Sequence, residues 1–218
     1  MSDTDTGAGA TRDPTGLWRW MRFFVLVAML TYVVTIVGAI ATWLVVSRTL
    51  DVGEQEGTII DMTFAVGALG SLLFYVLSAI ATARLTYRLM KNAHQLHSDE
   101  QLVSPGWAVG WYFIPFANLA MPPRAVGQIW RTTFRHLGQD RGSAIIGWWW
   151  AMWLISSIAL GISDRMSGPS SGMASEDYYI GLSIGYVLRL ICAGLLLVVF
   201  GTLAKAQKNL NRVADVFT

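Results

Sequence analysis

Four long apolar runs constrain the fold more than any other feature of this sequence. They cover residues 23–47, 59–83, 144–163 and 178–204. A helix rises about 1.5 Å per residue and the hydrocarbon core of a bilayer is about 30 Å thick, so roughly 20 residues are enough to cross it. The runs therefore predict an all-α integral membrane protein, built as a bundle of four transmembrane helices.

The composition agrees with this class of protein. Charged residues make up 14% of the chain and hydrophobic residues 54%, whereas a soluble domain carries about 25% charged residues. The first run is too long for the core of a signal peptide, so we interpret it as a retained membrane helix. The single cysteine, Cys192, lies inside the fourth run, which excludes a disulfide framework.

The basic residues orient the four helices. One side of the membrane receives Arg12, Arg19, Arg22, Arg84, Arg88, Lys91, Arg124, Arg131, Arg135, Arg141, Lys205, Lys208 and Arg212. Arg48 and Arg165 fall on the other side, where the loops are mostly acidic. Cytoplasmic loops carry an excess of Lys and Arg, so we predict that both termini are cytoplasmic.

The remaining boundaries follow from polarity. Residues 1–17 are small and polar and are predicted to form a disordered cytoplasmic N-terminus. The four-helix transmembrane domain is predicted over residues 18–210, followed by a cytoplasmic tail over residues 211–218.

The stretch 104–121 is apolar, but it does not fit a fifth span. Its apolar core, residues 107–116, is about half of a spanning length. Basic residues flank the stretch on both sides, so a crossing would place four arginines that follow it on the outer side. We therefore predict a re-entrant or interfacial segment between the second and third helices, entered from the cytoplasm.

Proline and glycine shape this segment. Pro115 fixes its own φ and disfavours helix at Ile114, and Gly110 relaxes the backbone nearby. Irregular backbone at membrane depth is tolerated only against protein or a wet cavity. Residues 113–118 are therefore expected to pack against the bundle, with the side-chain amide of Asn118 helping to satisfy polar groups.

A basic amphipathic helix is predicted over residues 122–137, with Pro122 and Pro123 in its first turn. Apolar residues recur at helical spacing, whereas most of the basic ones lie off that stripe: the apolar set is Val126, Ile129, Trp130, Phe134 and Leu137, and the polar set is Arg124, Gln128, Arg131 and Arg135. Two interpretations are equally open. The helix lies in the interface with its cations near anionic lipid head groups, or it is a connector that rests on the bundle.

The stretch "SPGWAVGWYFIPFANLAMPPRAVGQIW", preceded by "RLMKNA", resembles the bacterial membrane family known as domain of unknown function 4328. The resemblance covers about residues 84–131, and the chain departs from the family pattern at Pro123 and near Ala120. It implies this architecture and a location in the bacterial plasma (inner) membrane, and it implies no substrate.

Arg189 interrupts the last apolar run near mid-bilayer, where an arginine costs about 2.5 to 3.5 kcal/mol on insertion scales. In a functional interpretation, Arg189 binds an anionic group or lines a polar path. In a structural interpretation, it stabilises the fold by donating hydrogen bonds to carbonyls near Ile114 and to Asn118. Asp61 is an alternative partner. The candidate polar or hinge site consists of Arg189, Asn118, Pro115, Trp107, Gly110, Trp111, Pro123 and Arg124.

Two further motifs favour ordinary structural roles. His94 and His97, followed by Asp99 and Glu100, have a loose metal-like spacing, but a solvated helix end is the favoured interpretation because zinc takes at least three protein ligands. The small-residue motif "GLSIG", residues 181–185, favours close helix packing inside the chain over homodimerisation. No metal and no cofactor is expected.

These features predict a non-enzymatic membrane scaffold or partner-binding module. The alternative is a small channel or carrier with a polar site at Arg189 and the broken segment 113–118. No nucleophile elbow, P-loop or dinucleotide motif occurs, so no catalytic residue is expected. The expected partners are the lipid bilayer, anionic lipid head groups near the 122–137 helix, and a membrane protein or a second copy of the chain, with no nucleic acid.

Overall fold

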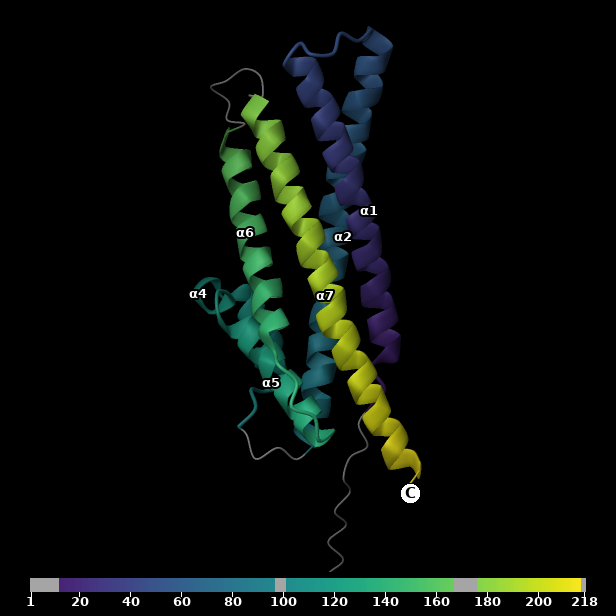
Figure 1. Ribbon diagram of the computed structural model, residues 1–218, viewed down its shortest axis with the longest axis vertical. Helices are drawn as coiled ribbons and strands as arrows, with labels where there is room; N and C mark the ends of the chain where they lie inside the picture. The colour runs from purple at the N-terminus through teal and green to yellow at the C-terminus, as the bar shows by residue number, and fades with distance from the viewer. Residues whose placement is uncertain (1–11, 97–100, 167–175, 217–218) are drawn as a thin grey trace, which may run out of the picture. The chain divides into compact units, whose positions relative to one another are not determined.

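The structure is a computed structural model that describes residues 12–96, 101–166 and 176–216. Within these ranges every regular element is helical, which confirms the all-α prediction. In chain order the elements are α1 (Thr15–Val46), α2 (Glu54–Gln95), α3 (Pro105–Gly110), the 3-10 helix η1 (Trp111–Phe113), α4 (Pro115–Asn118), α5 (Met121–His136), α6 (Ala144–Met166) and α7 (Glu176–Val216) (Figure 1).

The prediction of four membrane-spanning helices is confirmed. In the described part of the chain, α1, α2, α6 and α7 are each long and apolar enough to cross a bilayer. Two of them extend well past their apolar runs, since α2 has 42 residues and α7 has 41. Helix α7 continues to Val216, so most of the predicted tail 211–218 is helical.

Helix α1 begins earlier than the sequence predicts. Disorder is predicted for residues 1–17, but residues 15–17 belong to α1. The carboxylate of Asp13 accepts the backbone N–H of Thr15 at 2.8 Å, which satisfies one of the free donors of the first helical turn. This local capping is the physical reason for the difference. Residues 1–11 lie outside the described ranges.

The chain divides into two compact units along the lengths of its long helices. We call residues 1–20, 81–146 and 198–218 unit 1, and residues 21–80 and 147–197 unit 2. Every basic residue that the sequence assigns to the cytoplasmic side falls in unit 1, except Arg22. Unit 2 contains most of the four apolar runs.

In unit 2, α1 and α2 approach each other closely through glycine. A Cβ atom added at Gly38 would lie 2.7 Å from the Cα of Phe64, and one at Gly67 would lie 2.7 Å from the backbone nitrogen of Thr35. The hydroxyls of Thr35 and Ser71 form a buried hydrogen bond of 2.9 Å between the same two helices. The close contact between α1 and α2 is therefore possible because glycine has no side chain, as is common between membrane helices.

The motif at residues 181–185 packs inside the chain. A Cβ atom at Gly181 would lie 2.5 Å from the hydroxyl of Ser163, and one at Gly185 would lie 2.5 Å from a methyl group of Leu160. Both neighbours belong to α6. The glycine face of α7 is thus occupied by α6, in agreement with the intramolecular interpretation.

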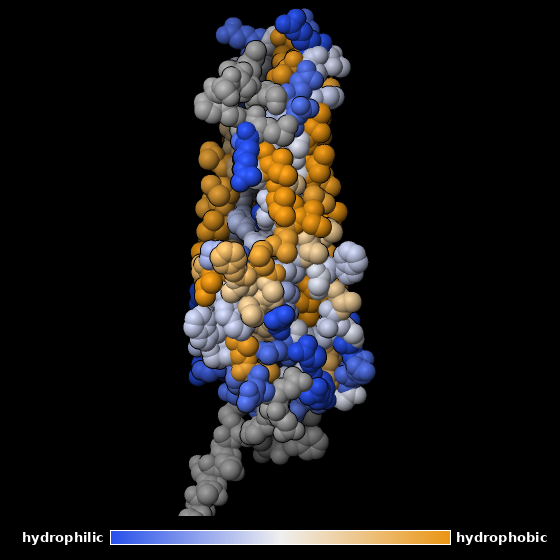
Figure 2. Space-filling view, turned by 90° about the vertical axis from the view of Figure 1, so that its left-hand side faces the viewer, coloured by the Kyte–Doolittle hydropathy of each residue, from blue (hydrophilic) through white to orange (hydrophobic). Residues whose placement is uncertain are grey.

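The outer surface of unit 2 is apolar. Val66, Leu69 and Leu72 on α2 are 67%, 70% and 64% exposed, whereas Thr35 and Ser71 are buried. On the face shown in Figure 2, hydrophobic residues form a broad region of the surface. This inverted distribution suits a lipid environment, in which polar groups must find partners inside the protein.

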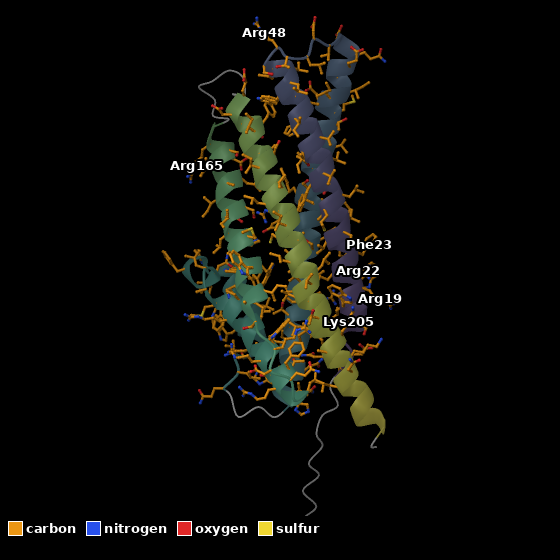
Figure 3. The ribbon with its side chains drawn as sticks, in the orientation of Figure 1. Arg19, Arg22, Phe23, Arg48, Arg165 and Lys205 are labelled. Carbon is orange, nitrogen blue, oxygen red and sulfur yellow. The ribbon has the colours of Figure 1, made fainter. Side chains whose placement is uncertain are left out.

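The charged ends of unit 2 are visible in Figure 3. Arg48 and Arg165 lie toward one end of this unit and Arg22 lies toward the other. Arg48 follows the C-terminus of α1 and Arg165 is in the last turn of α6. Between these ends the helices carry the apolar runs.

Unit 1 has its own core, made by the C-terminal parts of α2 and α7 together with α5. Its largest fully buried apolar residues are Leu85, Leu89, Met90, Ile129, Trp130, Val126, Val199, Phe200 and Leu203. The apolar stripe of α5 is therefore covered by the protein itself, while Arg124 and Arg131 are exposed. This burial favours the interpretation of α5 as a connector that packs on the helices of unit 1.

Candidate functional site

The segment between α2 and α5 is a chain of short helices in unit 1. Helix α3 begins at Pro105, and the hydroxyl of Ser104 accepts the backbone N–H of Trp107 at 3.4 Å. Trp107 is 55% exposed, and its ring centroid lies 6.5 Å from that of Trp111. A Cβ atom at Gly110 would lie 3.4 Å from the Trp107 ring, so the glycine leaves room for this indole.

The helix break at Pro115 is where the sequence predicts it. Ile114 has an extended backbone, with φ −101° and ψ 114°, and Pro115 starts α4. The backbone N–H of Asn118 donates to the carbonyl of Ile114 at 2.7 Å. Pro122 and Pro123 occupy the first turn of α5, which begins at Met121. Arg124 follows them and is exposed.

The orientation of this segment differs from the prediction. The sequence predicts that residues 113–118 pack against the bundle, but Phe113 is 80% exposed and Phe116 is 89% exposed. The reason is that the short helices satisfy much of the backbone locally, for example through the N–H of Leu119 and the carbonyl of Phe116 at 3.3 Å. The segment therefore does not need the bundle for its hydrogen bonds, and its aromatic side chains point outward.

Tyr112 anchors the segment in unit 1, and the sequence did not single it out. Its hydroxyl is buried. Burial raises the pKa of Tyr112, and the nearby side chain of Thr86 on α2 acts in the opposite direction with a smaller effect. In the sequence Tyr112 lies between the exposed Trp107 and Phe113, so its buried hydroxyl near Thr86 marks the side of the segment that faces α2.

Asn118 has a different role from the expected one within unit 1. Its side-chain oxygen is buried and accepts no hydrogen bond from any of the described residues. The backbone N–H of Asn118 closes α4, as described above. The predicted bond between Arg189 and Asn118 joins residues of different units and stays a prediction.

A second polar group lies around Arg189 in unit 2. The guanidinium donates to the hydroxyl of Ser157 on α6 at 3.2 Å, and its Cζ atom lies 4.6 Å from the ring centroid of Tyr75 on α2. The hydroxyl of Tyr75 accepts the indole N–H of Trp153 at 3.4 Å. We call Arg189, Ser157, Tyr75 and Trp153 the arginine cluster. It joins three of the four membrane helices.

The alternative partner Asp61 does not pair with Arg189. Asp61 is exposed near the start of α2, and no ion pair joins the two among the residues that the structure describes. Arg189 is held by neutral groups, a hydroxyl and an aromatic ring. Its positive charge is therefore not balanced by a carboxylate in the described part of the chain.

A buried polar network in unit 1 was missed by the sequence analysis. The side-chain N–H groups of Gln207 donate to the carbonyl of Leu89 at 3.1 Å and to the hydroxyl of Thr133 at 3.2 Å. Its oxygen accepts from Asn92 at 2.9 Å, and Asn92 also bonds both backbone groups of Arg12. Gln207 lies one helical turn after Leu203 and two turns after Phe200, so it is on an apolar face of α7. A polar residue on such a face is the sequence signal that could have indicated a buried polar network.

The histidine motif shows no metal site within the described residues. No three His, Cys, Asp or Glu side chains come together there. Nε2 of His94 lies 3.0 Å from the carbonyl of Val103, and because a carbonyl only accepts, this nitrogen carries the hydrogen. His97, Asp99 and Glu100 lie outside the described ranges.

The fold and these two sites define a multi-pass helical membrane protein with a proline-broken segment between its second and third membrane helices. The family model described as domain of unknown function (DUF4328) matches residues 48–205. The match covers most of the chain, so this protein belongs to that family. No curated protein and no solved structure matches it.

Proposed function

We propose that this protein is a non-enzymatic scaffold or partner-binding module of the bacterial plasma (inner) membrane, with both termini in the cytoplasm. The observation that carries the proposal is a cluster of exposed apolar side chains on the segment between α3 and α5. We call Phe113, Ile114, Phe116 and Leu119 the hinge tip. Their exposed fractions are 80%, 41%, 89% and 55%.

The chemistry of the hinge tip suits recognition by apolar contact. Large exposed aromatic side chains on a locally supported backbone are typical of sites that become buried against a partner. Because η1 and α4 satisfy much of their backbone internally, the tip has a defined shape before it binds. A partner with an apolar groove would bury the two phenylalanines and contribute most of the affinity there.

The distribution of charge supports the orientation. The basic residues assigned to the cytoplasmic side fall in unit 1 with the exception of Arg22, whereas Arg48 and Arg165, assigned to the other side, fall in unit 2. Since cytoplasmic loops are enriched in Lys and Arg, unit 1 is the cytoplasmic part in this proposal. The hinge tip belongs to the same unit, so its partner is a membrane protein that is accessible from the cytoplasmic leaflet.

Photo-crosslinking in native membranes tests the scaffold role. A photoreactive amino acid at position 116 should give a discrete protein adduct. The matched control is position 72, because Leu72 is 64% exposed on the apolar surface of unit 2. Lipid adducts alone at both positions would contradict the proposal, because the hinge tip would then be a membrane contact only.

A pair of substitutions separates binding from folding. Phe113→Ser with Phe116→Ser removes the aromatic rings but leaves the core of unit 1 intact, since both side chains are exposed. The double variant should keep its thermal stability in detergent and lose the protein captured at position 116. Phe113→Leu with Phe116→Leu keeps the tip apolar and should retain at least part of the capture.

One observation supports a channel or carrier as a second candidate function. Arg189 sits in a membrane helix and contacts neutral groups only, within the described residues. An arginine whose charge is not balanced inside the bundle attracts anions. Anion flux into liposomes that contain the purified protein, lost in Arg189→Gln, would favour this candidate over the scaffold.

A further inference from the structure

Unit 1 contains an open groove whose lining includes no residue of the hinge tip or of the arginine cluster. Its volume is about 480 Å³, within the range of small-molecule sites. Helix α2 contributes Arg84, Tyr87 and Arg88. The opposite lining is apolar or small and comes from Leu17 of α1 and Val109 of α3, with Gly106 at the start of α3.

The two arginines concentrate positive charge on one face of α2. Arg84 and Arg88 are one helical turn apart, so their side chains lie on the same side of the helix. Within the described ranges neither guanidinium makes a salt bridge or a hydrogen bond. Two planar guanidinium groups without a carboxylate partner suit the oxygens of a phosphate group.

The groove also lies at the level where hydrocarbon gives way to polar surroundings. The second apolar run ends at Ala83, which lines the groove directly before Arg84. Tyr87 is 46% exposed and Trp107 is 55% exposed in the same unit, and such aromatic residues are enriched at the membrane–water interface. The charged part of the groove therefore adjoins an apolar part along the helix.

We propose that this groove binds one anionic phospholipid, with its phosphate between Arg84 and Arg88 and an acyl chain along Leu17, Ala83 and Val109. A free phosphate would use the two arginines, but it would gain nothing from the apolar lining. The lipid uses both parts, which is why the groove is assigned to a lipid. This site goes beyond the proposed scaffold function and does not depend on it.

Native mass spectrometry of the full-length protein in detergent tests the charge part. Titration with phosphatidylglycerol and with phosphatidylcholine should show one tightly held phosphatidylglycerol. Arg84→Gln with Arg88→Gln should weaken that binding about 25-fold, because each basic residue beside an anionic lipid contributes about fivefold. The matched control is Lys91→Gln with Lys205→Gln, which removes the same charge from exposed positions outside the groove and should change binding less than threefold.

Filling the groove tests the apolar part while both arginines remain. Gly106 lines the groove, and a Cβ atom there meets nothing within 4 Å, so we expect the side chain of Gly106→Phe to occupy the groove. This variant should lose phosphatidylglycerol, whereas Gly142→Phe, also in open space in unit 1, should bind it like the wild type.

Three outcomes would overturn the proposal. The first is equal binding of phosphatidylcholine and phosphatidylglycerol to the wild type. The second is equal weakening in the two charge variants, which would show unspecific attraction. The third is complete displacement of the lipid by millimolar inorganic phosphate, together with unchanged phosphatidylglycerol binding in Gly106→Phe, which would assign the arginines to free phosphate.

Discussion

Arg189 shows how a membrane helix accommodates a charged residue without a carboxylate. Its guanidinium lies over the ring of Tyr75 and donates to Ser157, so three helices of unit 2 share the side chain. The ring faces a cation with its negative π-surface, and the hydroxyl supplies an acceptor. Desolvation of the guanidinium opposes the stabilisation from these two contacts. A single substitution of Arg189 therefore measures only the difference between the contact energy and the desolvation cost.

A double-mutant cycle isolates the contact between Arg189 and Tyr75. Unfolding in detergent is measured for Arg189→Met, Tyr75→Leu and the double variant. We expect a coupling energy of about 0.5 to 2 kcal/mol, the range of cation–π contacts. The same cycle with Arg165→Met, an exposed residue at the end of α6, should give no coupling. Equal coupling in both cycles would refute a direct interaction.

Gln207 is the residue on which the polar network of unit 1 converges. Gln207→Leu removes the donor to the Thr133 hydroxyl and the acceptor for Asn92, in a place that water does not reach. Leaving buried partners unsatisfied costs about 1 to 3 kcal/mol. We therefore expect the free energy of unfolding to fall by about that amount. Gln139→Leu, at an exposed position, is the control and should be close to neutral.

Among the elements, α1 and α2 depend on glycine for their separation. Gly67→Ala places a methyl group 2.7 Å from the backbone nitrogen of Thr35, which cannot move without shifting α1. Overpacking of this kind destabilises by about 1 to 3 kcal/mol. Gly161→Ala on α6 is matched, because its Cβ meets nothing within 4 Å. The stability of the Gly161→Ala control should increase by about 0.5 to 1 kcal/mol, because alanine favours helix more than glycine does. Thermal unfolding of the two variants distinguishes these opposite effects.

The segment between α2 and α5 separates what local sequence predicts from what it does not. Pro115 and the pair Pro122–Pro123 predict the break at Ile114 and the start of α5, because proline restricts φ and ψ of its immediate neighbours. The side on which Phe113 and Phe116 lie depends on how η1 and α4 turn. Successive residues of a short helix point in different directions. The position of the break at Ile114 therefore does not determine which side chains of the segment are exposed.

Helix α5 illustrates the same limit at the scale of an element. Its periodicity predicts an apolar stripe, and that stripe is present in Val126, Ile129 and Trp130. A stripe is equally suited to lipid and to protein, because both are apolar. Only the position of α5 against α2 and α7 shows that protein covers it. Gln207 was missed for a related reason, since its partners come from helices that are distant in sequence.

At the scale of the whole molecule, the side of the membrane reached by each loop is the property to test. Cys192→Ala provides a cysteine-free background. Ala120→Cys, just before α5, should react with an impermeant thiol reagent only from the cytoplasm. Leu50→Cys, 42% exposed between α1 and α2, should react only from outside. Labelling of position 120 from outside would show that residues 104–121 cross the membrane.

The sequence alone determined the class of this protein and its helices. Four apolar runs are long enough to cross a bilayer, and they form helices there because a helix satisfies its own backbone hydrogen bonds. The charges of the loops indicate the direction in which each helix crosses. The tertiary structure decided which residues meet: the ring beside Arg189, the network around Gln207, the covered face of α5 and the exposed hinge tip. Hydropathy is a property of single residues and can be summed along a chain. Contacts between distant helices depend on shape and distance in space, which no local pattern contains.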